Sequence, residues 1–312
     1  MKKLTVVMLA AVFAIGIFFT PSASHAVEAK VGLYMMGDWW QPGFIKFERE
    51  SAAKLFGDNL KHDSEGSFMF GPMFWVQLTG AWSLGGQVLF GLSRNEFKYS
   101  TMAADLNLAR GIPFGAFPGL VGGAYYDVGQ SKCRRYDTDL TAEWAFHKYL
   151  NLLIGLRFNY DDGEGDSIRL GFAGPLLDMK KEEYSAWYFG PSIGVGFHYE
   201  FIKGLTLSTG LSAIIQFGEY NNEKKYLWSF LTMIPYEYKV GYFCIGLDMN
   251  VKLAYLIQPA HLEVFVGGRY MMLPHIAAGD DSSGLDISYK DEWINGEIEH
   301  WGGIFFGAAY KF

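Results

Sequence analysis

The sequence predicts an all-β fold, a transmembrane antiparallel up-and-down β-barrel of about ten strands. Three observations support this class. Many segments alternate between apolar residues and small or polar residues, and the links between these segments are short and long in turn. The chain is also rich in aromatic residues (17%), yet after its first residues it contains no uninterrupted apolar helix. An apolar outward face combined with an enclosed polar face is typical of a membrane barrel.

The first residues, MKKLTVVMLAAVFAIGIFFTPSASHA, have the three parts of a secretory signal peptide. Two lysines precede an apolar run, and small residues ending at Ala26 form a cleavage site. We expect removal of residues 1–26, which leaves a single barrel domain over residues 27–312. Loss of the two lysines changes the formal charge from −7 to −9, and this acidity argues against a nucleic-acid partner.

The alternation is clearest over residues 205–217, LTLSTGLSAIIQF. The odd-numbered positions, which share one face of a strand, are Leu, Leu, Thr, Leu, Ala, Ile and Phe. The even-numbered positions, on the other face, are Thr, Ser, Gly, Ser, Ile and Gln. Residues 187–200 and 239–256 show the same pattern. The second face has glycine and small hydroxyl residues where a solvated sheet would carry many lysines and glutamates. This face is therefore predicted to line an enclosed lumen.

Ten strands are predicted at about 29–40, 67–78, 82–99, 134–146, 150–160, 187–200, 205–217, 239–256, 261–272 and 300–312. Short links separate four strand pairs, and long polar loops are expected near 41–66, 100–133, 161–186, 218–238 and 273–299. Short and long links alternate, so both termini lie on the short-turn side, which is periplasmic in bacterial outer-membrane barrels. The predicted location is the bacterial outer membrane. A count of twelve strands is also possible, because residues 100–133 could contain two more strands.

The last residues, GGIFFGAAYKF, resemble the C-terminal assembly signal of bacterial outer-membrane proteins. Phe312 is the final residue, Tyr310 lies two positions earlier, and apolar residues occupy each alternate position before it. The resemblance implies that the last strand closes the barrel against the first, and that the barrel assembly machinery recognises this end. The other expected partners are outer-membrane lipid and lipopolysaccharide, and no cofactor is expected.

Charged residues on the lumen-facing parity are predicted to form an internal ion-pair network, because enclosed charges must be paired. Measured from the short turns, the predicted strands place these residues at two heights. The lower group is Glu143, Lys252 and Glu263, and the higher group is Asp139, Arg157, Asp248 and Arg269. Such a network could be a structural plug or a selective ion path, and the sequence leaves both open.

The strand number favours a narrow lumen, since eight strands leave an interior just filled by side chains. Inward Met69, Met73, Trp75, Leu89 and Phe265 narrow it further. The leading hypothesis is a non-enzymatic, porin-like narrow pore or small-ligand conduit with surface-exposed loops, for which a small solute would be the partner. The alternative within the same class is a structural or adhesive surface protein with a plugged lumen.

An enzyme acting at the outer rim is the competing hypothesis, because the ten-strand layout is similar to that of the omptin family of outer-membrane proteases. That family uses an Asp-x-Asp pair and an Asp-x-His pair. This chain has Asp137-Thr138-Asp139, on the lumen-facing parity, but the segment GEYNNEKKYLW contains no histidine. A lipid-modifying enzyme is the other enzyme that could act at the outer rim. No catalytic residue and no metal ligand is assigned from the sequence. Whether Cys133 and Cys244 pair is left open.

Overall fold

The computed structural model of this protein describes residues 28–41, 60–64, 67–101, 125–171, 177–228, 231–283 and 298–312. The predicted signal peptide, residues 1–26, lies outside these residues. The described part is almost entirely β-strand. None of its helices is long and apolar enough to cross a membrane.

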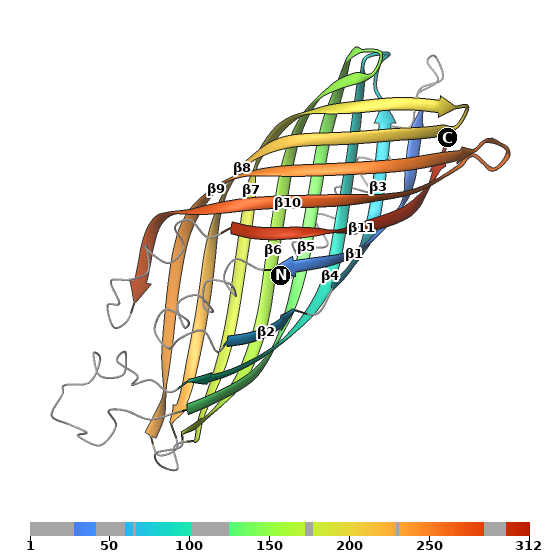
Figure 1. Cartoon of the computed structure of the whole chain (residues 1–312). Coiled ribbons are helices and arrows are strands. Elements are labelled where there is room, and N and C mark those ends of the chain that lie inside the picture. The colour runs from blue at the N-terminus through green and yellow to red at the C-terminus, as the bar shows by residue number, and fades with distance from the viewer. Residues whose placement is uncertain are drawn as a thin grey trace.

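Ten strands form a closed antiparallel barrel, and one further short strand extends its wall (Figure 1). Each barrel strand pairs with its neighbours in the chain, and pairing of β1 with β11 completes the ring. This confirms the predicted fold class and, for the described residues, the count of ten barrel strands. The barrel strands are β1 (Ala29–Gln41), β3 (Ser67–Gln77), β4 (Trp82–Thr101), β5 (Tyr125–His147), β6 (Leu150–Gly171), β7 (Leu177–Ile202), β8 (Leu205–Trp228), β9 (Leu231–Ile257), β10 (Leu262–Ser283) and β11 (Ile298–Lys311), and the short one is β2 (Leu60–Ser64).

The four short turns lie together at one end of the barrel, which we call the turn end; the opposite end is the extended end (Figure 1). Gly204 adopts a φ of 87° in the turn between β7 and β8, a conformation that glycine takes without strain. The 3₁₀ turn η1 (Gln258–Ala260) joins β9 to β10. The C-terminus also lies at the turn end, where the Phe312 amide donates to the Ala29 carbonyl at 2.9 Å.

The strands reach further toward the extended end than the sequence analysis predicted. Strand β5 already starts at Tyr125, β6 continues to Gly171, and β10 runs to Ser283. Much of the predicted loops 100–133, 161–186, 218–238 and 273–299 is therefore strand, although 102–124 and 284–297 lie outside the described residues. The physical reason is that strand segments beyond a membrane need no apolar outward face, so the alternation that identifies a strand is lost there.

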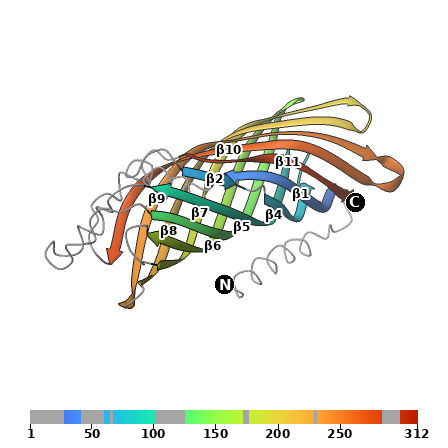
Figure 2. The ribbon, with the colours of Figure 1, turned by 60° about the horizontal axis from the view of Figure 1, so that its bottom comes forward.

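Over the described residues, the strands differ in how far they reach at the extended end of the barrel (Figure 2). Strand β11 pairs with β10 only as far as Pro274, whereas β10 continues to Ser283. Strands β1 and β3 end their pairing at Asp38 and Ser67. Among the described residues, the seven consecutive strands β4 to β10 thus extend further than β11, β1 and β3, and β2 pairs with the far part of β4. We call this further-reaching part of β4 to β10 the extended wall.

The outward face is an apolar band with charged residues at its border. On β8 the outward side chains from Leu205 to Phe217 are apolar except for Thr209, and the next outward residue is Glu219. A membrane-spanning strand needs roughly 9–11 residues, and the run from Leu205 to Phe217 is long enough to provide them. Ion pairs on the outward face join neighbouring strands at the border: the exposed Arg134 with the more covered Asp162 at 2.6 Å, and Lys239 with Glu219 at 3.7 Å.

Aromatic rings gather on the outward face near both edges of the apolar band, as expected for residues that settle at headgroup depth. Near the turn end Trp82 stacks on Trp144, with ring centroids 6.0 Å apart. Toward the extended end Phe217 packs on Phe243 at 5.1 Å. Tyr310 and Phe312 belong to the turn-end group and contact one another at 5.0 Å. The role of Phe312 in assembly stays a prediction.

Glycine on the lumen face makes room for large side chains from neighbouring strands. A Cβ added to Gly267 would overlap the ring of Phe305 and the carbonyl oxygen of Val251. The next residue, Gly268, faces outward, and its added Cβ would have no neighbour closer than 3.8 Å. Gly163 is covered in the same way by the ring of Tyr184. The glycine-rich inner face predicted from the sequence is therefore packed rather than empty.

Candidate functional site: a charge layer across the lumen

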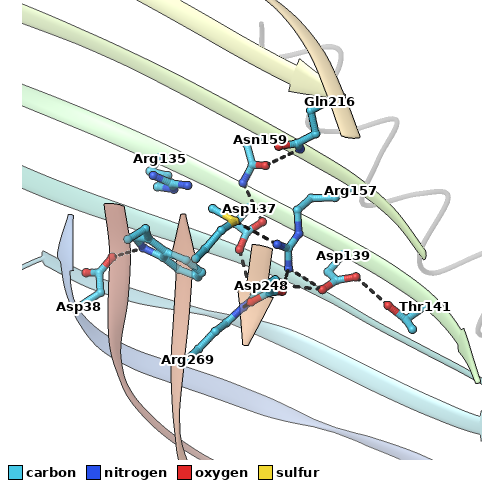
Figure 3. Close-up of polar contacts among 12 residues, drawn as sticks. Asp38, Arg135, Asp137, Asp139, Thr141, Arg157, Asn159, Gln216, Asp248 and Arg269 are labelled. Atoms are coloured by element: carbon cyan, nitrogen blue, oxygen red, sulfur yellow. Dashed lines mark hydrogen bonds and ion pairs between the residues drawn. The ribbon is translucent and has the colours of Figure 1, made fainter. Parts of the chain in front are cut away.

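Five charged side chains meet inside the lumen (Figure 3). Arg157 Nη2 lies 2.9 Å from Asp139 Oδ2 and 2.6 Å from Asp248 Oδ2. The Arg269 guanidinium lies 2.8 Å from Asp248, 3.3 Å from Asp139 and 3.4 Å from Asp137. Two arginines thus bind three carboxylates. These five residues are called the charge layer below.

The register of the sheet explains how distant parts of the chain reach one layer. Asp139 of β5 lies directly opposite Arg157 of β6. On the other side, Asp248 of β9 lies opposite Met271 and so is a diagonal neighbour of Arg269 on β10. The three remaining contacts cross the lumen and depend on closure of the barrel: Arg157 with Asp248, and Arg269 with Asp139 and Asp137.

The charge layer is almost completely removed from water. Asp137 is 0% exposed and Arg157 2%, while the Asp139 side chain keeps 22%. Arg157 Nη1 also donates to the Met271 sulfur at 3.0 Å. Large side chains that are less than 2% exposed fill the lumen on the same inner parity, including Met36, Met69, Leu89, Ile214, Met271, Leu273 and Trp301. Each charge of the layer has an oppositely charged partner within 3.4 Å.

A chain of amides leads from the charge layer toward β8. Asn159 Nδ2 donates to Asp137 Oδ1 at 2.8 Å, and Gln216 Nε2 donates to Asn159 Oδ1 at 3.0 Å. Both amide residues are fully buried (Figure 3). The two bonds hold the Asp137 carboxylate in place opposite Arg269, because each amide can donate in one direction and accept in the other.

A second ionic group lies nearer the turn end. Lys30 Nζ lies 2.6 Å from Glu263 Oε2, and Lys252 Nζ lies 3.8 Å from Glu263 Oε1. Glu143 accepts a hydrogen bond from Asn151 Nδ2 at 3.3 Å. The lysines keep 22% and 31% of their side chains exposed, so water reaches this group from the turn end. The sequence analysis named Glu143, Lys252 and Glu263 but missed Lys30, which lies at the very start of the first strand.

A third group lies toward the extended end; the sequence pattern places its Arg135 on the lumen face but does not predict the group. Arg135 Nη1 donates to Glu299 Oε1 at 3.0 Å, and Arg135 Nε lies 3.8 Å from Asp161 Oδ1. The Tyr188 hydroxyl donates to Glu299 Oε2 at 3.1 Å, and His275 Nε2 lies 3.7 Å from the same oxygen. All five side chains are buried. We call them the Arg135 cluster.

Trp301 connects the Arg135 cluster to the charge layer. The Arg135 and Arg269 guanidinium groups lie 5.1 and 4.9 Å from its ring centroid, and they belong to different groups. Its indole Nε1 donates to Asp38 Oδ2 at 2.5 Å, and Asp38 also accepts a bond from the Ser67 hydroxyl. Trp301 is 0% exposed. It is therefore the largest apolar surface shared by the two ionic groups.

The remaining sequence-level questions concern cysteines and metals. Cys133 and Cys244 are both buried and free, on β5 and β9, which are not adjacent strands. Within the described ranges, no three His, Cys, Asp or Glu side chains are grouped as metal ligands. The Asp137 and Asp139 pair, considered for rim catalysis, belongs to the charge layer.

Comparisons with known proteins show similarity at the level of fold. No protein-family model and no curated protein sequence matches the chain. The outer membrane protease OmpT of Escherichia coli is similar in structure with a TM-score of 0.50 at 12% identity, over 92% of this chain and 96% of that chain. The translocator domain of autotransporter NalP from Neisseria meningitidis matches with a TM-score of 0.37 at 7% identity; the match covers 100% of this chain and 98% of the NalP chain. The toluene transporter TbuX of Ralstonia pickettii matches with a TM-score of 0.35 at 7% identity; the match covers 93% of this chain and 90% of the TbuX chain.

The class of protein follows from the closed ten-stranded barrel, its apolar band and the OmpT likeness. This chain has the fold of a bacterial outer-membrane β-barrel. The similarity to the omptin family that the sequence suggested extends to the fold and leaves the activity undetermined, because 12% identity carries no site residues across.

Proposed function

We propose that this protein is an outer-membrane barrel with a sealed lumen, and that it acts at the cell surface rather than by passing solutes. The turn end and both termini face the periplasm, and the extended wall stands outside the cell. The observation that carries the proposal is the charge layer, whose Asp137 and Arg157 are no more than 2% exposed.

The chemistry of the charge layer supports a seal. The Arg157 guanidinium lies within 3.4 Å of two carboxylates and the Arg269 guanidinium within 3.4 Å of three. The packed side chains around these groups leave their polar atoms little contact with water. Separating such pairs to admit a solute would leave buried charges without partners, which costs about 3–5 kcal/mol for each pair. Among the two roles that the sequence left open for the ion pairs, the plug is therefore the better supported.

The extended wall supports a role outside the membrane. Strands β4 to β10 continue past the charged border residues Arg134 and Glu219, so several strands project beyond the apolar band. A barrel that served only as a membrane channel would need strands of roughly 9–11 residues. Function at this end is in keeping with the general placement of binding residues on exposed segments held by a rigid scaffold.

A narrow ion conduit, the leading hypothesis from the sequence, is the second candidate. Its support is that the charge layer is ionic and that Asp139 keeps 22% exposure, so one carboxylate is open to water from the turn end. Proteolysis at the rim has weaker support. Asp137 is bound to Arg269 and Asn159 and is fully buried, so it has no access to a peptide substrate.

Swelling of proteoliposomes tests the seal. We expect the refolded protein, residues 27–312, to let a monosaccharide enter no faster than protein-free liposomes do. The control is the double variant Arg157→Ser with Asp248→Ala, which removes one cation and one anion together and so leaves the charge balance of the lumen unchanged. This variant is expected to admit the sugar. Swelling caused by the unaltered barrel would contradict the proposal.

A further inference from the structure

Asp161 is a carboxyl group with an unusual lack of partners. It is 0% exposed and points into the lumen from β6, and neither of its oxygens accepts a hydrogen bond from any described residue. Its ion-pair contact is with Arg135 Nε at 3.8 Å, beyond hydrogen-bond distance. The same guanidinium donates at 3.0 Å to Glu299. The closer and better-aligned partner of Arg135 is thus Glu299.

The surroundings of Asp161 are acidic and phenolic. Within the described chain, Arg135 is the cationic residue that faces it, and His275 lies beyond, against Glu299. The other titratable groups that face it come from four strands besides β6. They are Cys133 and Asp137 of β5, Tyr188 of β7, Tyr242 of β9 and Glu299 of β11, while the adjacent Asp162 of β6 is a nearby negative charge that points outward. An ionised Asp161 would lie beside the carboxylates of Glu299 and Asp137 at a position that is 0% exposed.

An ionised carboxylate in such a place is very unfavourable. Burial of a charge without hydrogen bonds costs far more than burial of the neutral acid, and a protein normally responds by neutralising the group. A proton neutralises a carboxylate without requiring any further ligand. We infer that Asp161 is held as the neutral acid in the folded barrel, so that the Arg135 cluster is a proton-binding, pH-responsive closure at the outer end of the lumen.

The position of Asp161 along the lumen determines on which side of the membrane the pH affects it. The next residue, Asp162, faces outward and pairs with the exposed Arg134 at the border of the apolar band. Asp161 therefore lies close to the water on the extended side. Loss of its proton places a second negative charge next to Glu299, competes for Arg135 and weakens the packing of the cluster. This inference stands whether or not the lumen conducts, because it rests on the local burial of Asp161.

Unfolding at different pH values tests the inference. An aspartate in the unfolded chain ionises at about pH 3.9, so above that pH the folded barrel holds a proton that the unfolded chain lacks. Stability is then highest in acid and falls as pH rises, by about tenfold in the folding equilibrium constant per pH unit for one retained proton. We expect this slope in urea unfolding of the unaltered barrel. Asp161→Asn, which mimics the neutral acid, is expected to flatten it and to unfold at higher urea at alkaline pH.

The matched control is Asp162→Asn, which neutralises the adjacent, outward carboxylate and should leave the slope in place. Two results would overturn the inference: a slope unchanged in Asp161→Asn, or stability that depends on an added metal cation and is independent of pH. If Asp161→Asn does not fold, infrared spectra of the unaltered barrel containing ¹³C-labelled aspartate decide the question. The carbonyl band of a protonated carboxylic acid at neutral pH supports the inference, and its absence overturns it.

Discussion

Replacement of Arg157 by methionine is expected to lower the free energy of unfolding by about 3–5 kcal/mol, the usual effect of removing one partner from a buried ion pair. Arg157 binds Asp139 at 2.9 Å and Asp248 at 2.6 Å, and it is 2% exposed. Methionine is unbranched and apolar and replaces the aliphatic part of the arginine side chain, so the main loss is the guanidinium group with its ion pairs. What remains is a carboxylate of Asp248 that keeps only Arg269 as its partner.

The control for this variant is Arg134→Met, which removes the same type of residue from another arginine–aspartate pair. Arg134 binds Asp162 at 2.6 Å, but its side chain is 56% exposed on the outward face. Exposed pairs contribute about 0–1 kcal/mol because water screens them. Urea unfolding of both variants in one detergent provides the comparison. Equal effects at Arg157 and Arg134 would show that the charge layer is not buried as the structure describes.

Replacement of Trp301 by alanine is expected to cost about 3–5 kcal/mol, because it empties a large volume in the packed lumen. The ring is 0% exposed and lies between the Arg135 and Arg269 guanidinium groups. The substitution also removes the indole donor from Asp38, whose remaining side-chain donor is Ser67. Trp301→Phe keeps a ring and loses the donor, so its expected cost is smaller, about 1–3 kcal/mol.

Trp187→Ala is the matched control, since Trp187 lies on the outward face and is 41% exposed. Its loss opens no cavity inside the barrel. The expected order of destabilisation is Trp301→Ala, then Trp301→Phe, then Trp187→Ala. An equal loss of stability in the two alanine variants would contradict the view that the lumen is filled and that Trp301 joins its ionic groups.

The sequence was informative wherever the membrane constrains the outward face. Residues 205–217 alternate because their outward side chains must be apolar, and this parity also assigns inward residues without knowledge of the fold. Height above the turns then grouped Asp139, Arg157, Asp248 and Arg269, and the structure brings these four together. Lys252 and Glu263 also meet, at 3.8 Å.

The sequence was uninformative where that constraint ends. Asp161 and Glu299 lie in segments that read as polar loops, because strands beyond the apolar band lose the alternation. Asn159 was predicted to face the lumen, and alternate residues of a strand share a face. Extending the predicted strand 150–160 by one residue would have placed Asp161 in the lumen as well. The position of Trp301 was not predicted for a different reason: its contact with Arg135 joins β11 to β5, which are not neighbouring strands, across the closed ring. Such contacts depend on strand tilt and barrel closure, which one-dimensional patterns do not contain.

The sealed lumen is the central claim, and ion conductance tests it most directly. We predict that the refolded protein, residues 27–312, produces no current steps in a planar bilayer, while the folded Arg157→Ser with Asp248→Ala variant does. Reproducible small steps from the unaltered barrel, with an ion selectivity that changes in Asp248→Asn, would contradict the seal and show that the charge layer is an ion path.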